Sequence, residues 1–125
     1  MAFVVNIEDE TLINKNYRKV LYTSTNLYGM QLVVMNLKPE EEIGMEKHPS
    51  TDQFIRIEKG EATVIIGKTK KEVYTLKNTD AIVIPANTWH NVINVSHTKD
   101  LKLYTIYSPP EHTPGTIQKI KPKME

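Results

Sequence analysis

The sequence of 125 residues predicts an all-β fold, a sandwich or a barrel. Short runs rich in β-branched residues follow one another at intervals of roughly ten residues, a spacing typical of sandwiches and barrels rather than of alternating strands and helices. Most of the prolines and glycines fall between the runs, where turns are expected. The expected strands are Arg18–Thr23, Met30–Leu37, Gln53–Glu58, Ala62–Ile66, Glu72–Leu76, Ala81–Ile84, Trp89–Val95 and Leu101–Tyr107.

The two ends of the chain depart from this pattern. Only Glu8–Asn16 has helical character, with acidic residues near its start that suit the first turn of a helix. The proline-rich segment Ser108–Gly115 predicts an irregular arm over the surface, followed by a polar tail. The composition shows no linker, so residues 1–125 are expected to form a single domain.

The run Met30–Leu37 is apolar on both of its faces. A strand with one face in solvent alternates apolar and polar residues. Two apolar faces predict that one lies in the core and the other against a second sheet or a second subunit. We therefore expect a homodimer, which light scattering at micromolar concentration would test. The two sets are Met30, Leu32 and Val34 on one face, and Val33, Met35 and Leu37 on the other.

Composition narrows the classes of partner. The net charge is +1 and no basic stripe is interleaved with aromatic residues, so nucleic acid is not an expected partner. The chain has no cysteine, which excludes disulfides and thiolate metal sites. Its apolar runs are far shorter than the ~20 residues of a membrane span. The first ten residues lack the basic start of a secretory signal, so a cytoplasmic location without membrane contact is expected.

Two segments carry the residues that suggest chemistry. In the first, Glu46 and His48 are two positions apart, so on an extended chain their side chains point to the same face. Gln53 follows after a turn and opens the next strand. In the second, a tight turn that begins at Pro85 delivers His90 to the start of a strand. Imidazole and carboxylate groups are common ligands of divalent metal ions.

The two segments resemble the two motifs of the cupin superfamily. His48 matches the second histidine of the first motif, the acidic position falls on Gln53, and Gly60 matches its last glycine. In the second motif His90 falls at the histidine position. Pro85, Asn87 and Asn94 also fall at its positions, with Asn87 replacing a glycine where a left-handed backbone is needed.

The resemblance covers residues 32 to 110 or so, and it implies a double-stranded β-helix, the jelly-roll barrel of cupins, with a core at about 30–110. In particular the chain looks like the small single-domain cupins called mannose-6-phosphate isomerase-like. The family implies one divalent metal ion in the barrel, with a small-molecule ligand beside it. By position, the metal ligands here would be Glu46, His48, Gln53 and His90.

This ligand set departs from the family. The first histidine of the family is Glu46 here, its glutamate is Gln53, and the leading glycine lies two residues before Glu46 instead of six. Two imidazoles and one carboxylate still suit a divalent ion such as Zn, Mn, Fe or Ni. The amide oxygen of Gln53 is a weaker, neutral donor, so weaker metal binding than in the family is expected.

Each of these residues has an ordinary interpretation when it is taken alone. His48 precedes Pro49 and could be a turn residue, Glu46 could be a solvated carboxylate, and His90 could be a buried histidine with one hydrogen bond. Their joint occurrence at cupin spacings favours a site. The alternative that stays open is a degenerate cupin that has kept the shape of its pocket and lost its ion.

Other polar and aromatic residues receive structural expectations. Asn94 is expected to hydrogen-bond to backbone at the barrel rim and His97 to lie in a loop. Tyr104 and Tyr107 have opposite facing, so at most one of them lines the cavity. The arm that carries His112 could fold back over the barrel mouth. Arg56 is three positions after Gln53 on the same strand, so its side chain is expected to face away from the metal.

Three functions are compatible with these features. The first is an enzyme, an isomerase, epimerase or dioxygenase that acts on a sugar or a small organic acid, with Glu46 as a possible catalytic base. The chain has only two arginines, Arg18 and Arg56, and no arginine cluster near the motifs, which weakens a phosphosugar assignment. The second is a non-catalytic binding or sensing cupin with a weak or lost metal site, and the third is a structural barrel.

Overall fold

The computed structural model describes residues 2–123. Within this range lie one helix and nine strands: α1 (Ile7–Ile13), β1 (Arg18–Thr23), β2 (Gln31–Leu37), β3 (Asp52–Lys59), β4 (Ala62–Ile66), β5 (Glu72–Leu76), β6 (Ala81–Ile84), β7 (His90–Asn94), β8 (Leu101–Ser108) and β9 (Ile117–Gln118). None of the described residues belongs to a helix with the length and apolarity needed to cross a bilayer.

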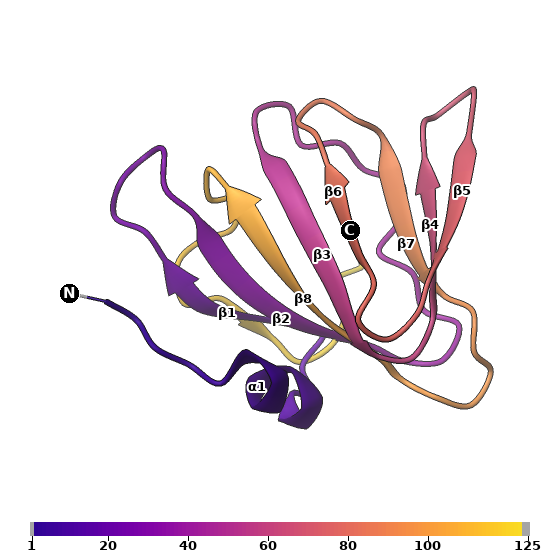
Figure 1. Ribbon diagram of the computed structural model, residues 1–125, viewed down its shortest axis with the longest axis horizontal. Coiled ribbons are helices and arrows are strands. Elements are labelled where there is room, and N and C mark those ends of the chain that lie inside the picture. Colours follow the sequence, from indigo (N-terminus) through magenta and orange to yellow (C-terminus); the bar gives the residue numbers. More distant parts are fainter. Residues whose placement is uncertain (1, 124–125) are drawn as a thin grey trace.

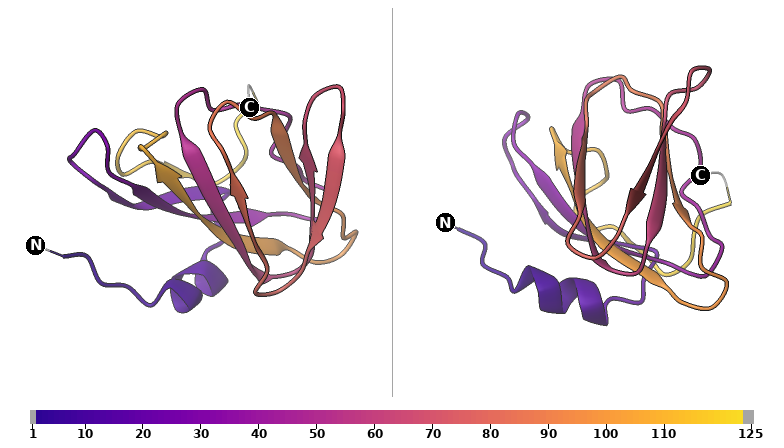
Figure 2. Two further views of the ribbon diagram at one scale, coloured as in Figure 1. Left: turned by 45° about the horizontal axis from the view of Figure 1, so that its top comes forward. Right: turned by 45° about the vertical axis from the view of Figure 1, so that its right-hand side comes forward.

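The strands form two antiparallel sheets that face each other (Figures 1 and 2). The six-stranded sheet has the order β6-β3-β8-β2-β1-β9, and the three-stranded sheet has the order β5-β4-β7. From β3 to β8 the chain passes back and forth between the two sheets, with the hairpin of β4 and β5 in the three-stranded sheet, as in a jelly roll. The predicted all-β cupin barrel is confirmed.

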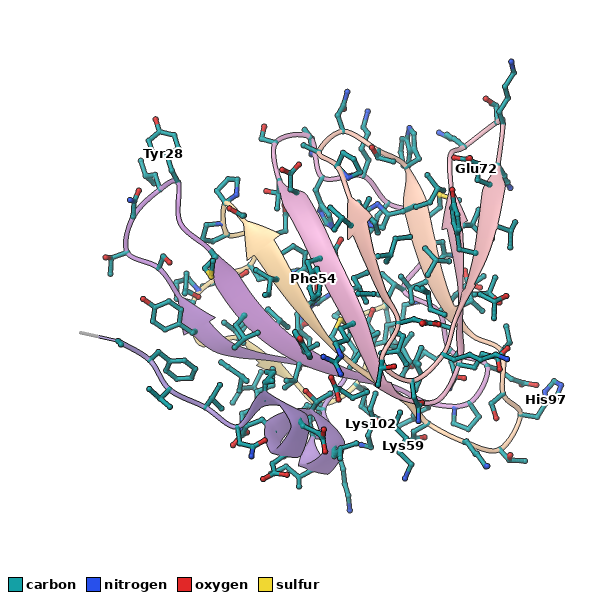
Figure 3. The ribbon with its side chains drawn as sticks, in the orientation of Figure 1. Tyr28, Phe54, Lys59, Glu72, His97 and Lys102 are labelled. Carbon is teal, nitrogen blue, oxygen red and sulfur yellow. The ribbon has the colours of Figure 1, made fainter. Side chains whose placement is uncertain are left out.

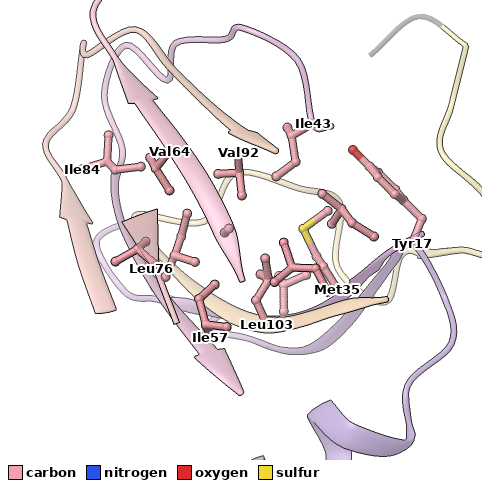
Figure 4. Close-up of a cluster of buried hydrophobic side chains, with 14 of the residues drawn as sticks. Tyr17, Met35, Ile43, Ile57, Val64, Leu76, Ile84, Val92 and Leu103 are labelled. Atoms are coloured by element: carbon pink, nitrogen blue, oxygen red, sulfur yellow. The ribbon is translucent and has the colours of Figure 1, made fainter. Parts of the chain in front are cut away.

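The core fills the space between the two sheets (Figure 4). In β3 and β8, buried residues alternate with more exposed ones, because successive side chains of a strand point to opposite faces. The side chains of Ile55, Ile57 and Leu103 point inward and are fully buried. From the opposite sheet, Val64 and Val92 meet them. The same alternation determines which polar residues at the ends of the strands point inward.

The strand predictions match the structure within two residues at each end. Four of them, β1, β4, β5 and β6, have the predicted bounds. The helix is shorter than predicted and begins earlier, because Asn6 caps it by accepting a hydrogen bond from the Asp9 backbone N–H at 3.0 Å. The polar tail that follows the arm contains β9, which was not among the expected strands and pairs with β1, joining Arg18 to Gln118.

The outer face of the six-stranded sheet is partly covered by the N-terminal segment of the same chain. Helix α1 packs against β2, β3 and β8 (Figure 1). Residues from Ala2 to Val5 line an apolar groove together with Leu32 and Ile106. On β2, Val33 faces the core and Val34 on the other face is also fully buried. An intramolecular cover thus accounts for part of the second apolar face, and the homodimer stays a prediction.

Candidate metal centre

A short piece of β-pairing outside the main strands places Glu46 beside His90. The backbone N–H of each residue donates to the carbonyl oxygen of the other, both at 2.9 Å. Directly opposed residues of an antiparallel pair present their side chains on the same face. The loop before β3 and the first residue of β7 therefore deliver a carboxylate and an imidazole to one point.

His48 is held at the same end of the barrel by the turn that precedes β7. The backbone N–H of Asn87 donates to the carbonyl oxygen of His48 at 2.7 Å. Asn87 has φ of 64°, the left-handed conformation expected where the family has glycine. A backbone hydrogen bond thus joins the two sequence motifs. The strands that follow them, β3 and β7, both start at the same end of the barrel, its mouth, at the top of Figure 1.

Gln53 lies on the inner face of β3, in a row of residues that runs across the sheet. It is paired directly with Tyr107 on β8, which in turn is paired with Gln31 on β2. All three side chains are buried. The Gln53 amide group donates to the Thr105 hydroxyl at 3.0 Å, which leaves its carbonyl oxygen without a hydrogen-bond partner among the described residues.

The side chains of Glu46, His48 and His90 converge. Their ligand atoms all lie within 4.8 Å of one another. Glu46 Oε2 is 3.3 Å from His48 Nε2 and 3.4 Å from His90 Nε2. Both Nε2 atoms are inaccessible to solvent and make no well-formed hydrogen bond within residues 2–123. Three of the four predicted ligands therefore meet, and the fourth, Gln53, offers a buried and unpaired oxygen.

The second ring nitrogen of each histidine has its own partner. His90 Nδ1 lies 2.9 Å from the carbonyl oxygen of Thr88. Because a carbonyl only accepts, the neutral ring must carry its proton on Nδ1 and its lone pair on Nε2. His48 Nδ1 lies 3.3 Å from Glu111 Oε1, so a carboxylate takes the same role there. Such partners orient the histidine ligands of metal sites.

Electrostatics at the site favour a charged carboxylate. Burial opposes the ionisation of Glu46, but its contacts with His48 and His90 outweigh burial and lower its pKa from 4.5 to about 2. Burial also opposes the protonation of His48, yet Glu46 and Glu111 on its two sides raise its pKa above the usual 6.5. The carboxylates therefore favour positive charge on the His48 ring, at the place where a cation would bind.

The donors present fit a divalent metal ion. Two imidazole Nε2 atoms and one carboxylate oxygen form the two-histidine, one-carboxylate set that suits Zn, Mn, Fe or Ni. Buried polar atoms are normally paired. Both Nε2 atoms are buried and, apart from their approach to Glu46, have no hydrogen-bond partner among residues 2–123, which indicates that a ligand completes the site. The fit rests on these orphaned atoms.

Sequence reasoning missed Glu111 and the part of the chain that carries it. The arm after β8 turns back across the barrel mouth and places Glu111 on His48 and the His112 ring against Tyr107, with ring centroids 5.1 Å apart. The sequence raised such a return for His112 but gave no signal for Glu111. Arg18 was also missed: it is buried on β1 and donates to the side chain of Gln118.

The remaining structural expectations hold. The amide of Asn94 donates to three backbone carbonyl oxygens, and His97 lies exposed in the β7–β8 loop at the far end from the mouth (Figure 3). Tyr107 faces inward, with its ring centroid 5.6 Å from that of His48, while Tyr104 packs on Phe54. The remaining side chain, Arg56, pairs with Glu58 at 3.0 Å, away from the site.

The family profile described as "Cupin domain" matches residues 33–107, which is more than half of the chain. The chain belongs to the cupin family. The match contains Glu46, His48, Gln53 and His90, and it ends before the arm that carries Glu111. Sequence and topology thus establish the cupin fold independently. The match does not extend to the mannose-6-phosphate isomerase-like subtype.

Similar proteins extend over nearly the whole cupin. An uncharacterized protein of Acanthamoeba polyphaga mimivirus is 52% identical over 122 residues, which cover 98% of this chain and 74% of that protein. The uncharacterized protein YrkC of Bacillus subtilis is 46% identical over 95% of this chain. The aligned region spans only 63% of YrkC.

Among solved structures, a Bacillus halodurans protein superposes with a TM-score of 0.89 at 42% identity, covering 97% of this chain and 91% of that one. A Thermus thermophilus protein superposes with a TM-score of 0.70 at 21% identity, covering 85% of this chain and 96% of that one. The second likeness concerns the fold alone.

Proposed function

We propose that this cupin binds one divalent metal ion through Glu46, His48 and His90, and uses it to bind and transform a sugar or a small organic acid. The observation that carries the proposal is the convergence on one carboxylate oxygen of two buried Nε2 atoms that make no hydrogen bond within the described residues. In a site without a ligand this arrangement leaves buried polar atoms unsatisfied, which costs about 1–3 kcal/mol per group. A bound cation would satisfy all of them together.

The residues of the chain have distinct roles in this proposal. His48 and His90 present neutral Nε2 lone pairs, each oriented by the partner of its Nδ1 atom. Glu46 supplies the negative charge, and Gln53 supplies a neutral oxygen from the wall of the barrel. A divalent ion bound there would act as a Lewis acid that polarises a carbonyl or activates water or dioxygen. The proposed reaction classes are isomerisation or epimerisation, and dioxygenation.

The state of Glu46 favours its role as a ligand over the predicted role as a catalytic base. An efficient general base has a pKa near the working pH. The two imidazoles hold the pKa of Glu46 at about 2 against the opposing effect of burial, so the carboxylate is a weak proton acceptor. Within the proposal, Glu46 binds the ion, and proton transfer to or from the substrate falls to another group or to metal-bound water.

A non-catalytic binding or sensing cupin is the second candidate. It is supported by Gln53, because its amide donates to Thr105 and offers the ion only a neutral oxygen where the family pattern has a carboxylate. A weaker ligand field suits reversible loading of metal or ligand better than turnover.

Metal analysis of protein purified without a histidine tag tests the proposal. We expect a bound divalent transition metal in an amount close to the protein concentration, and its loss when Glu46 is replaced in Glu46→Ala. Protein that neither retains nor takes up such an ion, while folded, contradicts it. An oxygen-uptake assay and a panel of sugar isomers then separate the catalytic proposal from the sensing one, because the sensing protein binds without turnover.

A further inference from the structure

The arm after β8 is fastened across the barrel mouth by one buried side chain, that of Gln31. Its amide oxygen accepts hydrogen bonds from the backbone N–H groups of Glu111 at 3.2 Å and His112 at 2.9 Å. Its amide nitrogen donates to the carbonyl oxygen of His112 at 2.7 Å and to the Thr23 hydroxyl at 3.0 Å. Gln31 is fully buried, so these contacts are sheltered from water. The glutamine fixes the backbone of two residues that lie eighty positions further along the chain.

The hydrogen bonds from Gln31 to the arm determine the position of Glu111. Its Oε1 lies 3.3 Å from His48 Nδ1, on the opposite side of the ring from Glu46. The edge of the same ring also meets Tyr107, with an interplanar angle of 88°. His48 is thus held on both nitrogens and from the side. The Glu111 side chain is 32% exposed, so the contact lies at the rim of the mouth.

We propose that Glu111 is the positioning residue for the ligand His48, and that Gln31 sets Glu111 in place. The inference rests on the proposed metal-binding function and extends it to residues outside the matched cupin region. A carboxylate on Nδ1 fixes the proton there, turns the Nε2 lone pair toward the metal position and raises the basicity of the ring. Within residues 2–123, the Nδ1 partner of the other ligand, His90, is the neutral Thr88 carbonyl oxygen. His48 is therefore the ligand whose strength depends on a distant part of the chain.

Zn²⁺ affinity, measured by competition with a chromogenic chelator on the full chain, is the first test. Loss of such an outer partner typically lowers metal affinity by about 10- to 100-fold, and we expect that loss for Glu111→Ala. Glu111→Gln keeps an acceptor without the charge and should fall between Glu111→Ala and the wild type. Glu40→Gln is the matched control, because Glu40 contacts the exposed His97 far from the mouth, and it should leave the affinity unchanged.

Gln31 is tested by a double-mutant cycle with Glu111. Gln31→Leu should weaken Zn²⁺ binding, and the loss should vanish in the Glu111→Ala background, because both changes remove the same contact. If Gln31 had a merely structural role, the losses of Zn²⁺ binding free energy in the two single variants would add in the double variant. Equal melting temperatures of the metal-free Glu111 variants and the wild type separate the effect on affinity from any effect on folding.

Nitrogen-15 NMR of the His48 ring supplies a readout that needs no metal. The wild type should show a hydrogen-bonded Nδ1–H proton that exchanges slowly with water, and Glu111→Ala should lose it. An unchanged signal, or a Zn²⁺ affinity of Glu111→Ala within twofold of the wild type, overturns the inference. If the wild type binds no metal but Glu111→Ala loses the signal, the proposed function fails and the positioning of His48 by Glu111 stands.

Discussion

The two ends of β7 each carry a buried polar side chain, and the two side chains differ in how fully they are hydrogen-bonded. His90 at the first position and Asn94 at the last are both 1% exposed, and both point into the barrel. Asn94 donates to the carbonyl oxygens of Leu37, Lys38 and Lys99 and accepts from the Ser96 N–H. His90, by contrast, has Nδ1 paired and Nε2 without a hydrogen bond in the described chain.

Asn94 stabilises the fold, whereas His90 has a nitrogen available to bind a ligand. Burying a polar group is favourable only when its hydrogen bonds are made inside the protein. Asn94 meets this condition with backbone atoms of two separate segments, residues 37–38 and 96–99, so its amide is part of the structure. His90 meets it only in part, through the 3.4 Å contact of Nε2 with Glu46, until a ligand binds Nε2. Replacing residues at the two ends should therefore have opposite consequences for stability and for metal binding.

The largest expected effect is on metal content, at the His90 end. His48→Ala and His90→Ala should reduce bound metal to the background level, because each removes one of two imidazole ligands. The metal-free protein should lose only the contacts of the replaced ring with the nearby carboxylates, so its loss of stability should be smaller than at the Asn94 end. Plasma emission analysis measures the metal and urea unfolding the stability. The exposed His97 provides the control His97→Ala, and metal retained in both site variants would refute the assignment.

The next effect is on stability, at the Asn94 end. Asn94→Ala leaves several backbone carbonyl oxygens without a donor, and we expect a loss of about 3 kcal/mol in the free energy of unfolding. Protein that stays folded should still bind metal as the wild type does. Urea denaturation with metal titration below the transition checks both. A loss of metal affinity larger than the loss of stability would mean that the two ends are not independent.

The dependence of stability on pH should change sign when metal is added. Since the folded pKa of Glu46 is about 2, its contribution is present above pH 4.5 and lost as the pH falls toward 2. Since the folded pKa of His48 is raised, its contribution is present below pH 6.5 and lost as the pH rises through the raised value.

The metal-free protein should therefore lose stability as the pH rises above 6.5. The additional stability conferred by Zn²⁺ should increase over the same range, because the ion binds deprotonated His48. Thermal unfolding with and without a chelator on either side of this pH measures both trends. Parallel curves in the two conditions would contradict a metal bound to His48.

The smallest effect concerns Gln53. Gln53→Ala should lower Zn²⁺ affinity less than either histidine variant, because a neutral amide oxygen is a weak donor. Gln53→Glu should tighten binding by adding a charge, and the Thr105 hydroxyl can donate to the new carboxylate in place of accepting from the amide. Calorimetric titration at one pH compares the variants. Identical affinities across the series would show that residue 53 does not reach the ion.

Most of the fold and the metal centre could be predicted because they follow from short-range patterns. Runs of β-branched residues between prolines and glycines marked the strands, and the spacing of Glu46 and His48 placed both side chains on one face. The turn at Asn87 followed from the left-handed backbone conformation, which asparagine adopts more readily than other residues with a side chain. Such local rules hold wherever one strand or turn decides the outcome.

Glu111, Gln31 and β9 could not be predicted because their positions depend on how the chain returns to the barrel. A proline-rich segment shows that regular structure ends, but not the direction that the chain takes afterwards. The row that connects Gln53, Tyr107 and Gln31 exists only once three strands are paired. The same limit applied to the outer face of β2, where a covering helix and a second subunit leave the same apolar pattern in the sequence.

A crystal structure with anomalous scattering recorded across several metal edges tests the central claim most directly. The account predicts one anomalous peak between His48 Nε2 and His90 Nε2, at about 2.0–2.1 Å from each, with Glu46 as the third ligand. A map with no peak at that position in protein supplied with metal, or a peak bound elsewhere on the surface, would contradict it.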